Sequence, residues 1–437
     1  MPPATGGCWL RELDPELTLA VRRAAAMLIC SFTLRGSIVL RGLLSLFLGW
    51  LRRMESGAGP MSVVVVAPFI AGSSFAHAIN SVKMAEGFAR LGHQVTLVCR
   101  QRPDGWVSVS ELTSRYGLQC PVEWHQVPHA CGEQRGFTRR VLWYLLRRRP
   151  SLVYARHYRV PCWTARMGLA TVAETHAHPG TTSKPFYRMI KATHRKAFRG
   201  VVTISRVLAE HYHTLGVPSS KLWVLPDAVD WEMFRRPVRL PPAPWSGHGP
   251  HIVYAGHLYD YKGIPTVLDA AAKLPQAMFH LVGGWPDDLR RQRERAEQMG
   301  LTNVVFHGLV PHAEVPRFLW HADVLLLPPS RHHPSARWTS PLKLAEYLAS
   351  GTPVVATDIP ALRAWVSDRE VEWARPDDAN ALASAVLRVL EGKGSADARA
   401  AVRLAQKYSY TARASCVCEA IFSQRRRSAI PAPRKAA

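Results

Sequence analysis

The stretch that decides the fold is residues 62–99, SVVVVAPFIAGSSFAHAINSVKMAEGFARLGHQVTLVC. Its β-branched beginning, 62–67, is typical of a strand that is buried on both faces of a parallel sheet. Between 77 and 91 the apolar residues recur with the period of one helix face, and Gly92 ends that helix. Residues 94–99 predict the next strand. The stretch therefore predicts a β–α–β unit with parallel strands.

The alternation of strand and helix continues and predicts two Rossmann-like domains. In the first, further strands are expected at 122–127, 151–155, 171–174, 200–204 and 221–225. Residues 235–250 are rich in Pro, Gly and Arg without periodicity, which predicts a linker. A second series follows, with strands at 252–255, 279–282, 304–307, 324–327 and 354–356. The predicted fold class is α/β, with two doubly wound parallel-sheet domains facing a cleft.

The charge of the chain indicates an anionic partner. The chain has 437 residues, and 56 Lys and Arg against 32 Asp and Glu give a formal net charge of +24. Arginine supplies 45 of the basic residues, as codon bias alone can produce, so we expect no nucleic-acid partner. The excess is concentrated in residues 61–240, where 25 basic and 10 acidic residues give +15.

The cysteines and the two ends of the chain limit the classes of protein and of site that the sequence allows. Eight cysteines without a Cys-x-x-Cys pair argue against a disulfide framework and a zinc site, and they fit a reducing cytoplasm. Residues 1–60 contain an apolar stretch interrupted by arginines, so no membrane span is expected. This segment predicts either an amphipathic helix on a membrane or untranslated sequence, since Met54 and Met61 are both plausible starts. Residues 423–437 predict a disordered basic tail.

Neither domain carries a fingerprint for a bound cofactor or metal. The Gly-x-Gly sequences at 57–59 and 247–249 precede a strand instead of following it, and there is no Walker A motif. There is no Asp-x-Asp motif, and the acidic pairs at 287–288 and 377–378 fit helix starts. We therefore expect no metal and no bound cofactor.

The most informative motif is TSPLKLAEYLASGTPVVA at 339–356. Ser340 suits a helix N-cap, and the following helix start offers free N–H groups to a diphosphate. Lys343 and Glu346 share one face of this helix, so Glu346 is placed to hold ribose hydroxyls. A capped helix with one i,i+3 pair would produce the same pattern.

Segments that follow other predicted strands supply further candidates. In YAGHLYDYKG, Gly256 allows a turn and Lys262 begins a helix, where it could neutralise a leaving diphosphate. A solvated loop lysine is the alternative. His176 follows a short strand and could bind a sugar hydroxyl, although a chain with 19 histidines has many without function. Gly72 and Ser73 form a turn whose backbone could approach a ligand.

In this order and spacing, the segments resemble glycosyltransferase family 4 over residues 62–425. The most specific part is 252–367, which includes HLVGG at 280–284. The resemblance implies the GT-B fold, with an N-terminal acceptor-side domain, a C-terminal domain for the nucleotide sugar, and a last helix that crosses back. The corresponding boundaries are expected at 61–240, 251–410 and 411–437.

The resemblance also implies the reaction and its residues. It implies retaining transfer from a nucleoside-diphosphate sugar, without metal or bound cofactor, to a glycan or lipid-linked acceptor. Lys262 matches the family's phosphate-binding lysine, Glu346 its ribose-binding glutamate, and His176 a histidine at the donor sugar. These three are the expected catalytic residues. The expected donor-binding residues are Gly72, Ser73, Gly256, Lys262, Gly283, Ser340, Leu342, Lys343 and Glu346.

Three departures from the family pattern concern the donor. Trp338 stands where the first glutamate of the Glu-x7-Glu motif belongs. His257 stands near the place of a phosphate-binding arginine, for which Lys343 is the expected substitute. The usual Gly-Gly pair of the first loop is reduced to Ala71 and Gly72.

The basic first domain predicts where the enzyme acts. An arginine cluster at 139–149 predicts docking on an anionic membrane, so we expect a cytoplasmic protein at the inner face of the cell membrane. The SPLK form of the motif resembles a subset involved in cell-surface polysaccharides. The alternatives are an inactive or non-transferase GT-B protein, either a sugar-nucleotide epimerase or a membrane-bound binding module.

Overall fold

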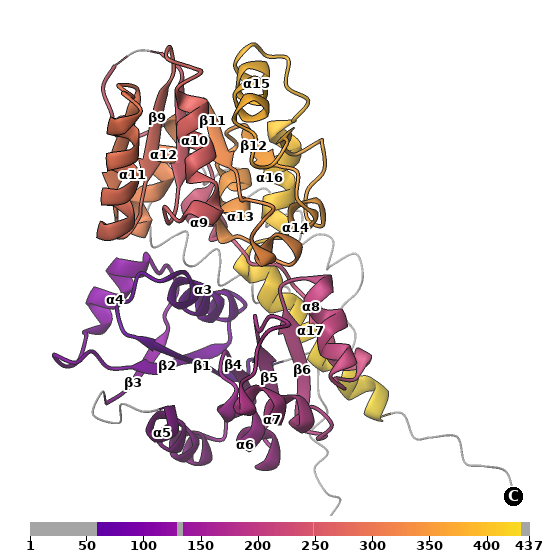
Figure 1. Ribbon diagram of the computed structural model, residues 1–437. Coiled ribbons are helices and arrows are strands. Elements are labelled where there is room, and N and C mark those ends of the chain that lie inside the picture. The colour runs from indigo at the N-terminus through magenta and orange to yellow at the C-terminus, as the bar shows by residue number, and fades with distance from the viewer. Residues whose placement is uncertain (1–58, 129–133, 248, 430–437) are drawn as a thin grey trace, which may run out of the picture. The chain divides into compact units, whose positions relative to one another are not determined.

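Two parallel β-sheets organise the part of the chain that the computed structural model describes, residues 59–128, 134–247 and 249–429 (Figure 1). This arrangement confirms the predicted α/β fold class with two parallel-sheet domains. The predictions for residues 1–58 and 430–437 lie outside the described residues. The described cysteines are all free thiols.

The first sheet has seven strands in the order β3-β2-β1-β4-β5-β6-β7. They are β1 (Ser62–Ile70), β2 (Gln94–Arg100), β3 (Glu123–Val127), β4 (Leu152–Ala155), β5 (Thr171–Glu174), β6 (Phe198–Thr203) and β7 (Leu222–Val224). Alternate valines of β1 enter two different core clusters, as expected for a strand covered on both faces. The strand order reverses direction at β1, the position where such sheets bind ligands beyond their carboxyl ends.

The second sheet has six strands in the order β10-β9-β8-β11-β12-β13, and it reverses direction at β8. They are β8 (His251–Ala255), β9 (Met278–Val282), β10 (Val304–Gly308), β11 (Val324–Leu327), β12 (Val354–Thr357) and β13 (Glu372–Ala374). The edge strand β13 was not expected, because three residues are too few to show a strand period.

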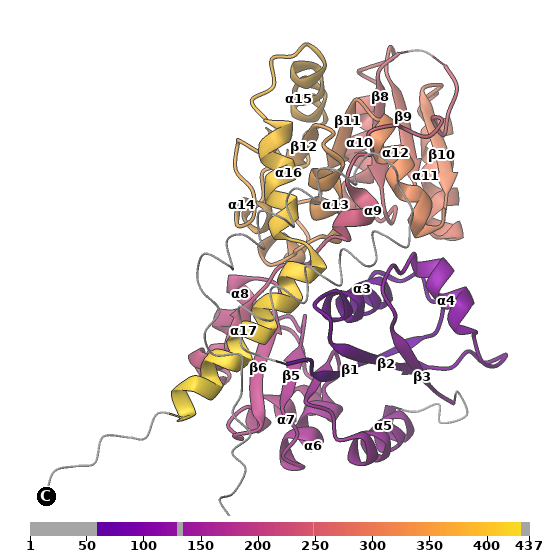
Figure 2. The same cartoon turned by 180° about the vertical axis from the view of Figure 1, so that it is seen from behind.

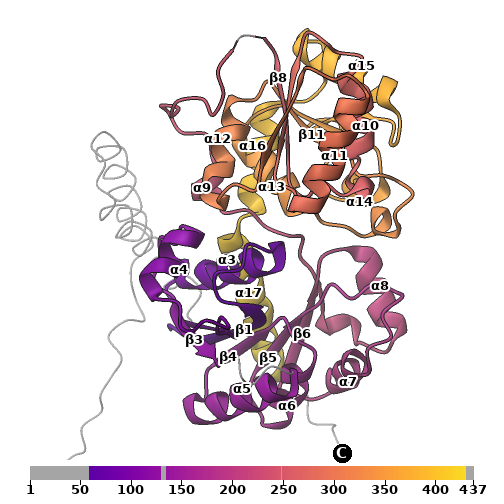
Figure 3. The same cartoon turned by 60° about the vertical axis from the view of Figure 1, so that its left-hand side comes forward.

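Helices connect the strands and cover both faces of each sheet (Figure 3). In the first domain they are α3 (Ala76–Arg90), α4 (Val109–Tyr116), α5 (Gln134–Arg148), α6 (Arg159–Arg166), α7 (Lys184–Ala192) and α8 (Arg206–Thr214). The others are α9 (Trp231–Phe234), α10 (Ile264–Ala271), α11 (Pro286–Gln298), α12 (Val315–His321), α13 (Leu342–Ser350), α14 (Pro360–Arg363), α15 (Ala379–Leu390), α16 (Ala398–Lys407) and α17 (Tyr410–Ala429). No helix in the described ranges is long and apolar enough to span a membrane.

The chain crosses from one domain to the other twice, and the two crossing segments are joined by backbone hydrogen bonds. The backbone amide of Val229 donates to the carbonyl of Tyr408, and that of Tyr410 donates back to Val229. After the second passage α17 packs against α3 in the first domain (Figure 2). The prediction of a disordered tail is wrong from residue 423 up to Ala429, because the backbone stays helical there.

Candidate active site

The loop after β8 holds the side chain of Lys343. Gly256 has φ of 146°, and a Cβ there would collide with the Lys343 ammonium group. Nζ of Lys343 lies 3.9 Å from the centre of the Tyr254 ring. Gly283, at the end of β9, also approaches this loop, since a Cβ there would lie 2.5 Å from the carbonyl oxygen of Gly256. Both glycines therefore permit the close backbone packing around Lys343.

Lys262 and Lys343 are half-buried lysines without an ion-pair partner among the described carboxylates. Burial lowers the pKa of Lys262. Burial and the charge of Lys262 lower the pKa of Lys343 well below its usual range, against the opposite effect of Glu346. The two ammonium groups face the rings of Tyr261 and Tyr254 instead of an anion. Desolvated cations of this kind favour an anionic ligand, because such a ligand restores their stable charged form.

The start of α13 lies against the first domain. The prediction that Ser340 caps this helix is wrong: the helix begins at Leu342, and the Ser340 hydroxyl accepts a hydrogen bond from the Asp227 amide at 2.9 Å. The Ser340 hydroxyl therefore makes a hydrogen bond between the two domains and does not cap the helix. Leu342 packs against the core cluster of the first sheet. The Leu344 amide donates to the Pro341 carbonyl at 2.9 Å, and the helix start as a whole favours an anion nearby.

Glu346 lies one turn further along α13 and is oriented by a histidine that the sequence analysis did not select. Nε2 of His312 lies 3.0 Å from Oε1 of Glu346, and both side chains are mostly buried. Tyr347 anchors the same helix to β8, since its hydroxyl oxygen accepts from the Ala255 amide at 2.7 Å. The helix is thus fixed relative to the loop that carries Lys262.

Gly72 and Ser73 form the turn after β1, and the unpredicted helix α4 holds this turn in place. The Arg115 guanidinium donates to the Gly72 carbonyl at 3.0 Å, and the Tyr116 hydroxyl donates to that of Ser73 at 2.8 Å. Arg102 donates to the preceding carbonyl at 3.2 Å. The carbonyls of the turn are therefore occupied, and α4 fixes its backbone.

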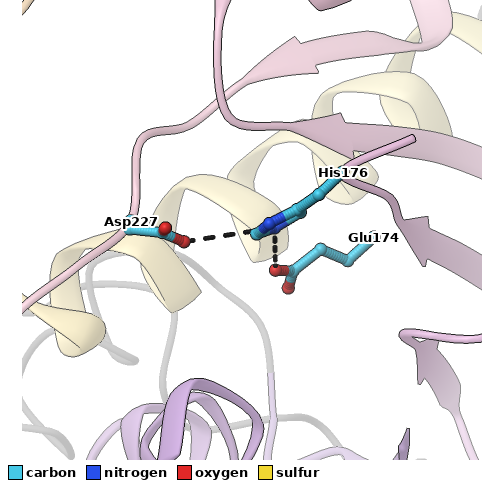
Figure 4. A group of neighbouring side chains, drawn as sticks. All are labelled: Glu174, His176 and Asp227. Carbon is cyan, nitrogen blue, oxygen red and sulfur yellow. Dashed lines mark hydrogen bonds and ion pairs between the residues drawn. The ribbon is translucent and has the colours of Figure 1, made fainter. Parts of the chain in front are cut away.

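His176 follows β5, and its ring lies between Glu174 and Asp227 (Figure 4). Nη2 of Arg156 lies 3.1 Å from Nδ1, and because a guanidinium can only donate, Nδ1 is the acceptor. Nε2 then carries the proton and donates to Oε1 of Glu174 at 2.9 Å. Oδ1 of Asp227 lies 4.0 Å from the same nitrogen. The imidazole is fixed in one orientation beside two carboxylates.

Glu174 is the centre of this network. Its carboxylate accepts a hydrogen bond from the Tyr154 hydroxyl. It accepts a second one from Arg413 of α17, with Nη1 and Oε2 3.3 Å apart. Burial by itself would raise the pKa of Glu174, but Arg413, His176 and Arg156 hold that pKa well below its usual range. Glu174 is therefore a permanent anion beneath His176.

Glu174, His176 and Asp227 each place one potential metal-ligand atom within 4.8 Å of the others. The chemistry of the donors fits an ion-pair network better than a cation site. Both oxygens of Glu174 face guanidinium groups, and Nδ1 of His176 already accepts from one of them. A divalent cation would have to displace these bonds and would be repelled by the arginines.

Trp338 and His257, the two other residues that differ from the family pattern, both stack against aromatic rings. Trp338 stacks against His178, with ring centres 6.2 Å apart, and packs on the core that contains Phe186. His257 stacks against Trp285 at 5.4 Å, and Trp285 contacts Phe75 of the first domain at 5.1 Å. Neither position supplies the charge that the family residue would.

The expected site residues thus form two groups. On the second domain, Gly256, Gly283, Lys262 and Lys343 cluster around the loop after β8, and Glu346 lies on the helix next to them. The other group is centred on His176 of the first domain. Ser340 accepts a hydrogen bond from the Asp227 amide, and the Asp227 carboxylate lies 4.0 Å from His176, so Ser340 links the two groups. The contacts of Gly72 and Ser73 described above are with Arg115 and Tyr116 of the same domain. Their loop reaches the second domain through the ring contact of Phe75 with Trp285.

Two family models match the chain. The model described as "Glycosyltransferase Family 4" matches residues 81–232, and the one described as "Glycosyl transferases group 1" matches residues 249–392. The two segments do not overlap and together make up more than half of the chain.

Similar proteins with curated names cover different parts of the chain. A protein provisionally named colanic acid biosynthesis glycosyltransferase WcaL, from Escherichia coli (strain K12), is 31% identical over 42% of this chain and 45% of its own length. Its namesake from Salmonella typhimurium is 25% identical over 68% of this chain and 83% of its own length. The amylovoran biosynthesis glycosyltransferase AmsK of Erwinia amylovora is 27% identical over 44% and 48%. The chain thus matches less than half of the E. coli and Erwinia relatives.

Solved structures of the same fold cover most of the chain. Anabaena Alr3699/HepE, crystallised with UDP and glucose, has a TM-score of 0.63 at 16% identity, over 83% of this chain and all of its own. A sucrose-phosphate synthase from Thermosynechococcus elongatus has a TM-score of 0.61 at 17% identity, over 84% of this chain and all of its own. At this identity the likeness establishes the fold, which is GT-B. The chain belongs to glycosyltransferase family 4.

Proposed function

We propose that the protein is a retaining, metal-independent glycosyltransferase. It moves a sugar from a nucleoside-diphosphate sugar to a glycan or lipid-linked acceptor in the synthesis of cell-surface polysaccharide or glycolipid. The observation that carries the proposal is the pair of half-buried lysines, Lys262 and Lys343, which have no ion-pair partner among the described carboxylates and lie beside the start of α13. This combination suits a diphosphate that gains negative charge as it leaves.

The other side chains have separate roles in this mechanism. Glu346, oriented by His312, holds the ribose hydroxyls of the donor. His176 binds a hydroxyl of the donor sugar, and the network around Glu174 fixes its orientation. The lysines supply the positive charge that a metal ion would otherwise provide, so the donor diphosphate is neutralised by the chain itself.

The names of the relatives support the cell-surface role. The relatives from E. coli, Salmonella and Erwinia are named for colanic acid and amylovoran synthesis, and the Anabaena structure was crystallised with UDP. A uridine diphosphate sugar is accordingly the first donor to test.

The surface of α5 supports an anionic membrane as a partner. Trp143 is 56% exposed and Leu146 is 51% exposed, and Arg139, Arg140 and Arg147 lie at helical spacing on the same face. Exposed aromatic and aliphatic side chains between arginines suit the interface of an anionic bilayer. In this proposal the first domain docks on the membrane and receives the acceptor there.

Binding and turnover with a panel of nucleotide sugars test the proposal. We expect one donor to bind tightly, and Lys262→Met and Glu346→Gln to reduce turnover about 100-fold each, the usual scale for a lost transition-state contact. Lys273→Met and Glu297→Gln remove the same kinds of charge from exposed positions of the second domain and serve as controls. Near-normal turnover in both site variants would refute the site assignment.

The same panel separates the alternatives. A sugar-nucleotide epimerase would release an epimerised product without any acceptor. A membrane-bound binding module would bind neither nucleoside diphosphates nor their sugars. A transferase releases the nucleoside diphosphate at a rate that depends on acceptor, and chelation of divalent cations leaves this rate unchanged.

A further inference from the structure

A concave site lies between α6 and α7 on the first domain. It is a cavity of about 200 Å³ lined by Arg159, Cys162, Trp163 and Arg166 of α6 and by Pro185 and Arg188 of α7. α6 packs against both α5 and α7 (Figures 1 and 3).

The charge of this cavity is not compensated within the described residues. None of its three arginines forms an ion pair with a described carboxylate, and Nε of Arg159 is buried without a hydrogen-bond partner. Some other exposed arginines are paired, as Arg363 is with Asp358 and Arg290 with Asp287. Three guanidinium groups around one cavity, with an unused buried donor, specify an anion with several acceptor oxygens.

The remaining lining residues restrict the anion further. The indole of Trp163 is 47% exposed, and the Arg166 guanidinium lies 5.0 Å from the centre of its ring. The neighbouring Tyr187 on α7 is 40% exposed. Amphipathic aromatic rings next to arginines are typical of protein surfaces that lie at the level of the lipid headgroups, between the apolar acyl chains and water. A freely dissolved anion would not need these rings.

We propose that the α6–α7 cavity binds the phosphate group of a membrane lipid, which seats the first domain on the bilayer at a defined position. The arginines bind phosphate oxygens, and Trp163 and Tyr187 enter the headgroup region beside them. This inference extends the membrane docking of the proposed function and identifies a specific headgroup site within an otherwise diffuse basic surface.

Vesicle binding by the full chain tests the proposal. The vesicles contain phosphatidylcholine with phosphatidic acid, or with a phosphate-free fatty acid at equal surface charge. The site variant is R159Q/R166Q/R188Q, and the control R369Q/R399Q/R403Q removes equal charge from exposed positions of the second domain. We expect the site variant to lose about 100-fold in affinity for the phosphatidic acid vesicles, on the scale of three lost contacts with lipid charge. The control variant stays close to wild type.

The possible results of this experiment distinguish a headgroup site from diffuse charge attraction and from a site for free phosphate. Preference of the wild type for phosphatidic acid over the fatty acid, abolished in the site variant, supports the headgroup site. Equal binding to both vesicle types, or equal losses in the two variants, overturns it in favour of diffuse charge attraction. Full competition by inorganic phosphate without lipid preference overturns the lipid as the ligand. Nucleoside-diphosphate affinity and thermal unfolding of each variant show that the donor site and the fold are intact, so failure here leaves the transferase proposal standing.

Discussion

Arg413 of the C-terminal helix α17 donates to the buried carboxylate of Glu174, with Nη1 and Oε2 3.3 Å apart. Only 4% of Arg413 and 2% of Glu174 is exposed to solvent. Glu174 in turn accepts a hydrogen bond from Nε2 of His176. Helix α17 therefore supplies the charge that stabilises the Glu174 anion next to a candidate catalytic histidine, and the orientation of His176 depends on the docking of α17.

The first prediction concerns the coupling of this pair. Glu174→Gln and Arg413→Met should each lower the free energy of unfolding by about 3 kcal/mol, because each leaves a buried charge without its partner. The double variant should lose at least about 1.5 kcal/mol less than the sum of the two, which urea denaturation measures.

The exposed pair Asp358 and Arg363 provides the matched control. Its double-mutant cycle should give a coupling below about 1 kcal/mol, since solvent screens exposed ion pairs. Additive effects of the Glu174 and Arg413 variants would contradict the structural link from α17 to His176.

The second prediction concerns His176 itself. His176→Ala should reduce turnover about 100-fold, the lower end for a lost group that acts on the reacting sugar. Its effect on the affinity for the nucleoside diphosphate should be small, because the lysines proposed to bind the phosphates lie on the other domain. Initial rates and calorimetric titration separate the two quantities, and His194→Ala, at an exposed position, is the control. A loss of diphosphate affinity equal to the loss of turnover would place His176 in the phosphate site instead.

Most of the fold could be predicted because its strands are continuous apolar runs and its longer helices show a clear period. The elements that escaped are short. The three-residue β13 shows no strand period, and the eight-residue α4 presents only two buried side chains, Leu112 and Tyr116, to reveal a helix face. Yet α4 fixes the Gly72 turn, so a short element without a sequence pattern still determines the geometry of the site.

The candidate residues could be selected from loops after strands, but their partners could not. Glu346 and His312 are separated by 34 positions, and Glu174 and Arg413 by 239, so no local pattern connects them. The role of Ser340 was misjudged for the same reason. A hydroxyl before a helix suggests a cap, and only the structure shows that the Asp227 amide competes for it.

The third prediction follows from the lowered pKa of the two lysines. Burial without an anion favours their neutral forms, and a bound diphosphate should raise both pKa values again. Binding of a nucleoside diphosphate should therefore take up protons, and the affinity should fall as the pH rises through the pKa values of the complex. Titration calorimetry in buffers with different ionisation enthalpies measures this uptake. Lys343→Met should remove most of it, and uptake that survives this substitution would point to another group.

The fourth prediction concerns Trp338, which stands where the family has a glutamate and stacks on His178. We expect Trp338→Ala and Trp338→Glu to change the ratio of kcat/KM between competing nucleotide sugars by about 10-fold or more, the scale on which pocket contacts discriminate substrates. The dissociation constant of the nucleoside diphosphate should stay within about 3-fold of the wild type, because Trp338 makes none of the contacts of the lysine cluster. Competition assays with paired donors measure the first quantity and calorimetry the second. Unchanged donor ratios together with lower stability would show that the indole only fills the space between His178 and the core around Phe186.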